Sequence, residues 1–325
     1  MKHVSILIPV GDTSFSNLEA TYKMFSMAND HLVKAGEQPA FKVQMVGLKS
    51  DALVSAGKFS VQPDITIDEL DNTDLIVIPA IHGNYSNVVN SNIEFAPWIV
   101  KQYKAGAEVA SLCIGAFLLA STGLLEGRHC ATHWLAAQEF RQMFPMVNLV
   151  DDKIITDESG IYTSGGAYSS LNLNLYLIEK YVGREMAVLH SKIFEIDIER
   201  DSQSPFIIFR GQRDHGDAEV QRAQDFIENQ FAEKISVDAL CSLLALGRRT
   251  FERRFKKATG NTIVEYVQRV RVEAAKKLLE KGRKNVSEVM YEVGYSDPTA
   301  FREVFRNYAG LTPLEYRSKF ALVAA

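Results

Sequence analysis

Residues 249–266 read RTFERRFKKATGNTIVEY, and residues 299–316 read TAFREVFRNYAGLTPLEY. The two stretches share a pair of phenylalanines four positions apart, followed at the same distance by Gly-x-Thr-x-x-Glu-Tyr. A short apolar segment at helical spacing precedes each stretch, at residues 237–244 and 286–293. Each copy therefore predicts a helix, a tight turn and a second, basic helix, which together form a helix-turn-helix unit. We expect the two units at about residues 236–257 and 286–308.

The second helix of each unit presents a polar face opposite its phenylalanines. Arginine can donate two hydrogen bonds to guanine, glutamate can accept one from cytosine, and lysine can pair with phosphates. A helix expected at residues 262–281 would hold two such recognition helices about one DNA turn (~34 Å) apart, on one side of a duplex. The outward side chains are Arg249, Glu252, Arg253, Lys256 and Lys257 in the first unit and Thr299, Arg302, Glu303 and Arg306 in the second. These features predict double-stranded DNA as a partner.

A basic helix face on its own is more often a solvated surface than a DNA-binding one. Solvation, however, gives no reason to repeat the same motif, and here the chain resembles the AraC/XylS family of transcription regulators over about residues 217–320. The resemblance rests on RTFERRF at 249–255, GYSDP at 294–298, F-R-x-x-F at 301–305 and G-x-T-P-x-x-Y-R at 310–317. It departs at Gly247, where the family usually has a serine that caps the helix. The resemblance implies an all-α DNA-binding domain, places Pro298 among the base-facing positions and adds RNA polymerase as a partner.

The first 195 residues alternate strand-like and helix-like segments. Such alternation predicts a parallel sheet with helices on both faces, an α/β doubly wound fold. Residues 75–79 and 108–113 are nearly all apolar, as central parallel strands should be. Strands are expected at residues 4–9, 41–48, 75–79, 108–113 and 161–164, and helices at 18–33, 94–104, 115–122, 133–144 and 170–181. Periodicity is lost at 196–216, which predicts a linker between a domain at 1–195 and a domain at 217–325.

Cys113 lies where an apolar strand turns into a helix, within ASLCIGAF at residues 110–117. This is the geometry of a nucleophile elbow, and Gly115 permits the tight turn. A thiol at a helix N-terminus is favoured as the thiolate by the helix dipole. Three roles stay open for Cys113: a residue that lines a ligand pocket, an inert buried cysteine, and a catalytic nucleophile for which His133 is a candidate base.

Two histidines are further candidates for this site. His82 and Gly83 follow the strand at 75–79, and the carboxyl ends of parallel strands are where α/β folds bind ligands. The N–H of Gly83 would be available to an anion. His133, beside Trp134, either borders the pocket or is a packed, hydrogen-bonded histidine.

Residues 111–134 and the pair Gly165-Gly166 resemble the PfpI/ThiJ group of the class I glutamine amidotransferase-like fold. In the enzymes of that group the cysteine is the nucleophile, assisted by a histidine or by an acidic residue from the first strand–helix junction. This chain has Ile114 in place of the histidine and Asn17 at the acidic position, and another usual aspartate appears as Asn172; an amide takes up no proton at neutral pH. The alignment near Asn17 is short, so Asp12 and Glu19 stay open as acidic groups. We expect a ligand site without catalysis at Cys113, Ile114, His82, Gly83, Asn17 and His133.

Charge and composition restrict the classes of protein. The net charge is −4, but residues 217–325 carry 19 basic and 15 acidic side chains, and residues 1–216 carry 17 and 25, so only the second part is basic. No apolar run approaches the ~20 residues of a membrane span. The three cysteines form no CxxC pair, so no disulfide framework, metal site or cofactor is expected. A reducing cytoplasm fits this composition best.

The order of the two domains resembles the GlxA subgroup of AraC-type regulators, as does R-x-x-Q-x-P-F at residues 200–206. The resemblance implies that the first domain senses a small-molecule effector, often a nitrogen-containing metabolite, and forms a homodimer. A second hypothesis is a cysteine-dependent amide hydrolase or hydratase that uses Cys113 and carries its own DNA-binding domain. A third is redox sensing by Cys113.

Overall fold

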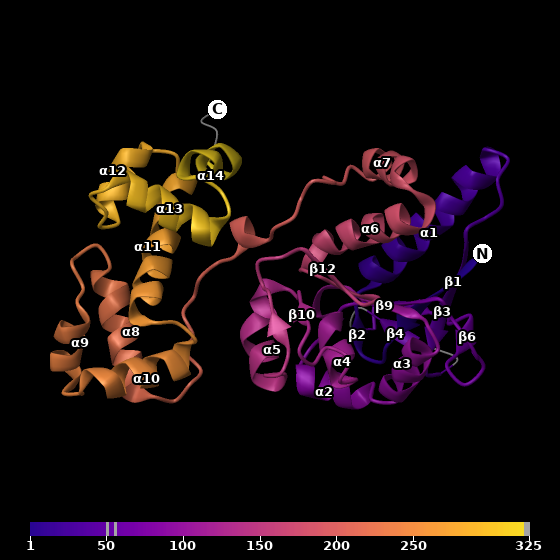
Figure 1. The fold of residues 1–325 in the computed structure, drawn as a ribbon, viewed down its shortest axis with the longest axis horizontal. Coiled ribbons are helices and arrows are strands. Elements are labelled where there is room, and N and C mark those ends of the chain that lie inside the picture. The colour runs from indigo at the N-terminus through magenta and orange to yellow at the C-terminus, as the bar shows by residue number, and fades with distance from the viewer. Residues whose placement is uncertain (50–51, 55–56, 322–325) are drawn as a thin grey trace. The chain divides into compact units, whose positions relative to one another are not determined.

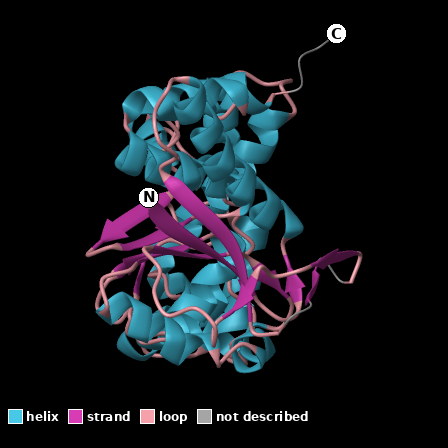
Figure 2. Cartoon of the chain, turned by 90° about the vertical axis from the view of Figure 1, so that its right-hand side faces the viewer, coloured by secondary structure: helices cyan, strands magenta, loops and turns pink. Residues whose placement is uncertain are grey.

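The computed structural model describes residues 1–49, 52–54 and 57–321. The chain divides into two compact units, Met1–Gln203 and Ser204–Ala325 (Figure 1). Every strand of the described residues lies in the first unit, and the second is built from helices (Figure 1). The strands are drawn in magenta in Figure 2. Within the same residues, none of the helices combines the length and the apolar composition that a membrane crossing needs.

A seven-stranded sheet forms the centre of the first unit, in the order β12-β13-β9-β7-β1-β3-β6. All neighbouring strands are parallel except β12 and β13, which pair antiparallel at one edge. The strands of this sheet are β1 (Lys2–Ile8), β3 (Phe41–Gly47), β6 (Ile65–Thr66), β7 (Leu75–Ile78), β9 (Glu108–Ser111), β12 (Ile155–Glu158) and β13 (Ile161–Ser164). Three two-stranded pairs lie outside it: β2 (Asp12–Thr13) with β8 (Ile81–His82), β4 (Ala52–Val54) with β5 (Phe59–Val61), and β10 (His129–Cys130) with β11 (Asn148–Leu149).

Helices cover both faces of the sheet because alternate strand side chains point to opposite faces. Leu75 and Val77 of β7 contribute to one apolar core, and Ile76 and Ile78 contribute to the other. The first core is shared with α1 (Phe15–Lys34), α6 (Ser170–Val182) and α7 (Arg184–Ile193), and the second with α2 (Tyr85–Ser91), α3 (Phe95–Lys104), α4 (Ala116–Ser121) and α5 (Ala137–Met143). This arrangement, visible in Figure 1, confirms the α/β doubly wound fold.

The five expected strands and five expected helices of this unit are all present, with ends shifted by at most a few residues. The apolar and alternating patterns predicted them because packing against the sheet requires those patterns. The sequence did not indicate the antiparallel strand β12 or the helices α2 and α7, which are short or less regular in pattern.

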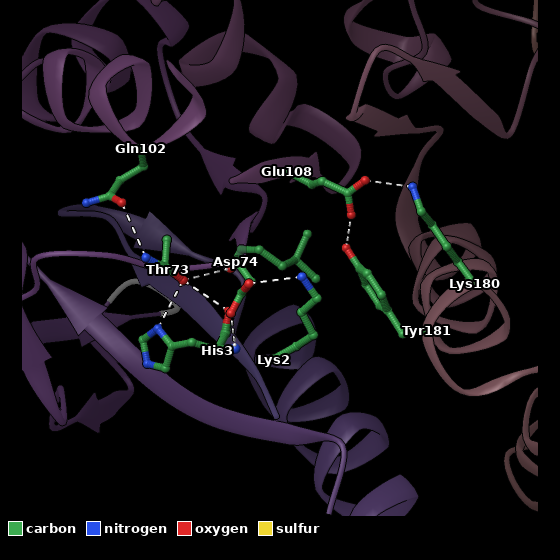
Figure 3. A network of polar contacts seen from close by, with 9 residues as sticks. Lys2, His3, Thr73, Asp74, Gln102, Glu108, Lys180 and Tyr181 are labelled. Carbon is green, nitrogen blue, oxygen red and sulfur yellow. Dashed lines mark hydrogen bonds and ion pairs between the residues drawn. The ribbon is translucent and has the colours of Figure 1, made fainter. Parts of the chain in front are cut away.

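Polar contacts hold the amino-terminal edge of the sheet, where β1, β7 and β9 begin (Figure 3). Asp74 accepts hydrogen bonds from the Lys2 side chain (3.0 Å) and from the His3 amide (2.8 Å). Gln102 of α3 accepts from the Thr73 amide at 3.3 Å and donates to the Asp71 carbonyl at 2.9 Å. Further along the edge, Glu108 pairs with Lys180 and accepts from Tyr181 of α6. This edge is therefore occupied by structural contacts.

His190 of α7 is fully buried beside His31 of α1, with ring centroids 5.7 Å apart. Neither of its ring nitrogens has a hydrogen-bond partner among the described residues. Burial, aided by the charge of His31, lowers the pKa of His190 to about 4. A neutral imidazole is thus built into the packing of the two helices.

We expect this histidine to make the first unit sensitive to acid. The pKa is lower in the folded state than in the unfolded state, so the stabilisation is complete above about pH 6.5 and is lost as the pH falls through about 4. The loss should reach roughly 2 kcal/mol, and His190→Phe should remove most of it. Urea unfolding of both proteins between pH 7 and pH 4 measures the difference; equal pH slopes would contradict the assignment.

The second unit contains two helical layers that share the long helix α11 (Ile263–Glu280). The first layer has α8 (Ala218–Gln230), α9 (Val237–Leu244) and α10 (Arg248–Thr259), and the second has α12 (Val286–Glu292), α13 (Pro298–Ala309) and α14 (Pro313–Phe320). Each layer has its own apolar core, one around Phe251 and Phe255 and one around Phe301 and Phe305. The duplicated helix-turn-helix architecture follows directly from the repeated phenylalanines.

The expected linker at 196–216 is divided between the two units. The Ile154 amide donates to the Asp201 carbonyl (3.1 Å) and the Gln203 amide to the Asp152 carbonyl (2.8 Å), so residues up to 203 belong to the first unit. Phe209 packs in the core of the second unit. The sequence did not indicate this, because irregular backbone held by hydrogen bonds carries no periodic pattern.

Candidate functional site

Cys113 follows β9 at the carboxyl edge of the sheet, opposite the polar edge described above. Its φ of +55° is a left-handed conformation that a residue with a Cβ adopts only under strain. Gly115 is required here, because a Cβ at this position would lie 2.6 Å from the carbonyl oxygens of Ile78 and Pro79. The turn is therefore the sharp elbow that the sequence predicts.

The thiol of Cys113 is buried, with 4% of the residue exposed. Burial raises its pKa, and the amides of Ala167 and Ile114, which face the sulfur, only partly oppose this. The sequence predicted a favoured thiolate from the helix dipole, and this prediction is wrong. The α4 helix that follows the elbow has only six residues, and burial, which penalises the charged thiolate, has the largest effect on the pKa.

His133 is half-buried, and its ring lies against the backbone of Gly166. A Cβ at Gly166 would be 2.1 Å from the His133 Cδ2 atom, so only glycine leaves room for the ring. The Nδ1 atom accepts a hydrogen bond from the Leu135 amide at 3.1 Å. Burial, together with the nearby His82, lowers the pKa of His133, so the ring is neutral at neutral pH. The ring thus has the packing and the hydrogen bond of a structural histidine at the border of the site.

His82 and Gly83 are exposed at the end of β8. Gly83 has φ +124°, which only glycine adopts without strain, and Asn84 then caps α2 by accepting from the Asn87 amide at 3.0 Å. His82 lies close enough to His133 for its charge to lower the pKa of that ring.

Asn17 and Ile114 are placed differently from the other candidates. The Asn17 side chain accepts from the Ala80 amide at 3.0 Å and donates to the Ser170 hydroxyl at 3.2 Å, which ties α1 to the loop after β7 and to α6. Ile114 lies in the core shared with α3 and α4, 6% exposed. Both side chains are engaged in packing around the site.

The structure therefore gathers Cys113, His133 and His82 around one edge of the sheet and places Tyr85 and Ala167 beside Cys113. Tyr85 stacks on Phe117 with centroids 4.0 Å apart, and burial, Glu139 and the Cys113 thiol raise the pKa of its hydroxyl. Ala167, at φ +48°, turns its amide toward the thiol. No pattern in the sequence marks a left-handed alanine.

The helix predicted to be the first recognition helix is α10. Phe251 and Phe255 are fully buried on one face, while the other face is exposed. The exposed side chains include all the base-facing candidates of this unit, which are Arg249, Glu252, Arg253, Lys256 and Lys257. Glu252 forms an ion pair with Arg248 at 3.1 Å, and this pairing reduces the repulsion between its carboxylate and DNA phosphates. Gly247 stands at the N-cap without a side-chain hydrogen bond.

A groove of about 630 Å³ runs beside α10. It is lined by the basic side chains of that helix and by the start of α11, where Val264 is 60% exposed. Arg248 and Arg249 contribute two of its positive charges, and such a lining suits a phosphate backbone with a sugar beside it.

The second recognition helix, α13, has the same construction. Asp297 caps it by accepting from the Ala300 amide at 2.8 Å, and Pro298 occupies its first turn. Phe301 and Phe305 are buried, and the opposite face is exposed with the candidates Pro298, Thr299, Arg302, Glu303 and Arg306.

A hydrogen bond from a tyrosine to a glutamate recurs in both layers of the second unit. Tyr266 donates to Glu228 at 2.5 Å, and Tyr316 donates to Glu280 at 2.7 Å. The repeated motif residues thus hold the frame, and the exposed residues between them differ from one unit to the other.

Two family models match the sequence. The model of the DJ-1/PfpI family matches residues 4–180, more than half of the chain. A model described as a helix-turn-helix domain matches residues 240–319.

Several curated proteins are similar over most of the chain. The HTH-type transcriptional regulator GbdR of Pseudomonas aeruginosa is 25% identical over 260 residues, which cover 79% of this chain and 69% of that protein. The HTH-type transcriptional regulator CdhR of Pseudomonas aeruginosa is 24% identical over 84% of this chain and 80% of its own length. The HTH-type transcriptional regulator GlxA of Rhizobium meliloti is 24% identical over 66% of this chain and 67% of its own length.

Solved structures share the fold. A putative transcriptional regulator from Vibrio parahaemolyticus has a TM-score of 0.53 at 22% identity and covers 59% of this chain and 98% of its own. A ThiJ/PfpI family protein from Pseudomonas syringae has a TM-score of 0.50 at 14% identity, covering 79% of this chain and 88% of its own.

Proposed function

The chain belongs to the DJ-1/PfpI family and carries an AraC-type helix-turn-helix domain, and on this premise we propose that it is a DNA-binding transcriptional regulator whose first unit senses a small molecule without catalysis. The observation that carries the proposal is the pair of recognition helices. Each buries its phenylalanines and exposes arginines on the opposite face, on a frame that shares α11. Residues Arg249, Glu252, Arg253, Lys256 and Lys257 of α10, and Pro298, Thr299, Arg302, Glu303 and Arg306 of α13, are the proposed DNA contacts.

The partners follow from the same proposal. Double-stranded DNA at a promoter is the first, RNA polymerase is the second, and a small metabolite, which the GlxA resemblance suggests to be nitrogen-containing, is the effector. We propose a homodimer, because the two subunits of a dimer can each bind one half-site of a DNA site with two-fold symmetry. We propose the cytoplasm as the compartment in which this complex acts.

The test is a selection of duplexes from a random pool by the full-length chain, followed by footprinting. Two protected major-groove segments about one helical turn apart are expected, because two recognition helices on one frame face the same side of DNA. The logarithm of the affinity should fall linearly with the logarithm of the salt concentration, with a slope set by the number of phosphates contacted. Recovery of a random set of duplexes with no shared motif would refute the proposal.

The effector site is proposed at the carboxyl edge of the sheet, around Cys113, His82, Gly83 and His133, with Ile114 and Asn17 supporting it. An effector acts there only if it binds one conformation of the protein better than another. Because His133 and the buried thiol are both uncharged, they suit a polar molecule without a charge. The Gly83 amide can in addition donate a hydrogen bond to an anionic group.

The second candidate function is a cysteine-dependent amide hydrolase or hydratase. The strained φ of Cys113 favours it, as do the two amides that face its sulfur, since backbone donors aimed at the sulfur stabilise a thiolate nucleophile. The raised thiol pKa opposes it, as does the engagement of the His133 Nδ1 atom with the Leu135 amide.

Alkylation separates the two functions. We expect Cys113 to react with iodoacetamide at pH 7 at least about tenfold more slowly than the same cysteine in the urea-unfolded chain, because the folded thiol is neutral and covered. Mass spectrometry of tryptic peptides follows each cysteine separately. Cys130, whose pKa burial raises to about 12, is an internal reference that should be slower still. A faster reaction in the folded chain would instead support the hydrolase.

A further inference from the structure

Gln203, the last residue of the first unit, is held by backbone groups on every side. Its Nε2 atom donates to the carbonyls of Thr132 at 2.9 Å and Lys153 at 3.1 Å, and its Oε1 atom accepts from the Gly166 amide at 3.3 Å. The residue is 2% exposed. A Cβ at Gly165 would lie 2.9 Å from the Nε2 atom, so the side chain packs directly against the backbone of Gly165.

The groups that hold Gln203 also form the wall of the proposed effector site. Thr132 precedes His133, and its hydroxyl donates to the Cys113 carbonyl at 3.0 Å. Gly166 supports the His133 ring and precedes Ala167, whose amide faces the Cys113 thiol. A ligand that displaces His133 or Ala167 must therefore move the hydrogen-bonding partners of Gln203.

The next residues, 204–213, form a strap on the second unit. The Ile207 carbonyl accepts from Lys276, and the Phe209 amide donates to Glu273 at 3.1 Å. Lys276 and Glu273 are themselves an ion pair at 3.4 Å, with only 5% and 11% of their side chains exposed. Because buried charges need all their partners, removal of the strap backbone would leave this pair incompletely hydrogen-bonded.

The strap continues from α11 to α8. Arg213 pairs with Asp225 at 2.7 Å and with Glu228 at 2.6 Å, and Glu228 also accepts from Tyr266. A Cβ at Gly211 would lie 2.4 Å from the Tyr266 hydroxyl, so the strap passes directly over the tyrosine of the repeated motif. The strap thus braces α8 against α11, the helix that also carries the second recognition layer.

The two attachments are adjacent in the sequence, because Gln203 is the last residue of the first unit and Ser204, the first residue of the second, is also buried. We propose that Gln203 is the positioning residue that transmits occupancy of the Cys113–His133 site to the strap, and that the strap sets the relative orientation of α10 and α13. This inference rests on the proposed function, since it specifies how the effector site regulates DNA binding. For the orientation of these two helices to change, an effector bound at the Cys113–His133 site needs only to favour one arrangement of Gln203 over another.

Gly166→Ala serves as a fixed stand-in for an occupant in the full-length protein, because its methyl group must push the His133 ring aside. Two quantities are measured: the Kd for a duplex selected by the wild-type chain, and the hydrogen exchange of peptides that cover 204–213. The substitution should change the Kd by at least about fivefold and speed the exchange of the Phe209 amide. In a Gln203→Ala background, Gly166→Ala should change the Kd by less than about twofold, and it should no longer change the hydrogen exchange of residues 204–213.

Gln102→Ala is the matched control, because Gln102 is also a buried glutamine that holds two backbone groups of the first unit (Figure 3). In that background Gly166→Ala should keep its full effect. Equal effects with and without Gln203, or no effect in the wild-type background, would overturn the inference. Should Gly166→Ala fail to fold, His133→Ala removes the ring and is judged by the same criteria. If the chain selects no duplex, the proposed function is refuted. The coupling between the Cys113–His133 site and residues 204–213 can still be tested in that case, because hydrogen exchange is measured without DNA.

Discussion

Replacing both Arg253 and Arg302 with alanine is expected to abolish the preference of the full-length chain for its selected duplex. The two side chains are exposed on different recognition helices, and neither forms an ion pair with any residue that the structure describes. A guanidinium that donates two hydrogen bonds to guanine contributes about 1–3 kcal/mol of discrimination, so the double variant should bind that duplex roughly a hundredfold more weakly. Titration against the selected and a scrambled duplex measures the effect.

Arg254 is the control for this prediction. It is the sequence neighbour of Arg253, but its guanidinium pairs with Asp217 through two contacts of 2.6 and 2.9 Å. Arg254→Ala should therefore lower the stability of the second unit modestly and leave the sequence preference intact. Unchanged discrimination in the double variant, or an equal loss in Arg254→Ala, would show that α10 and α13 do not contact the bases.

The second large effect is expected from Gly294→Ala. Gly294 makes the turn before α13 with φ +82°, and a Cβ there would lie 2.3 Å from the Ala232 carbonyl oxygen. The substitution combines a left-handed alanine with a collision against backbone, which cannot rotate away as a side chain can. We expect a loss of more than about 4 kcal/mol of stability in the second unit and no measurable DNA binding, while the first unit keeps its own unfolding transition. Calorimetry of the full-length chain measures both units.

Gly260→Ala separates the two causes. Gly260 ends α10 with φ +72°, but no heavy atom lies within 4 Å of its Cβ position. Only the conformational cost of about 1–2 kcal/mol remains there. If both variants lost the same amount, the close approach of Gly294 to Ala232 would not be what constrains this turn.

The elements of both units could be predicted well because their patterns are local. The central strands β7 and β9 are apolar because both faces of the sheet are buried, and the phenylalanine pairs of α10 and α13 are apolar because one face of each helix is buried. The spacing of apolar residues therefore records these elements. The elbow at Cys113 was also predictable from a local signal, because a residue larger than Gly115 would collide with the backbone at the end of β7.

The chemistry of the candidate site was less predictable. Burial raises the pKa of Cys113 and so disfavours the expected thiolate, and the extent of this burial depends on residues from distant segments that cover the elbow. Likewise, Asn17 was considered for its place at a catalytic position, and the structure uses both ends of its amide to join α1 to Ala80 and Ser170. Neither outcome is encoded within a short window of sequence.

By itself, the sequence determined the α/β and helix-turn-helix architecture, the two helices of each helix-turn-helix unit and the position of the strained elbow, because helical and strand periods, caps and obligatory glycines act over a few residues. Only the tertiary structure decided that Cys113 is a protonated thiol, that His190 is a neutral buried imidazole, and that the expected linker is held on both sides of Gln203. These properties depend on desolvation and on hydrogen bonds between segments far apart in the chain, which no local pattern records.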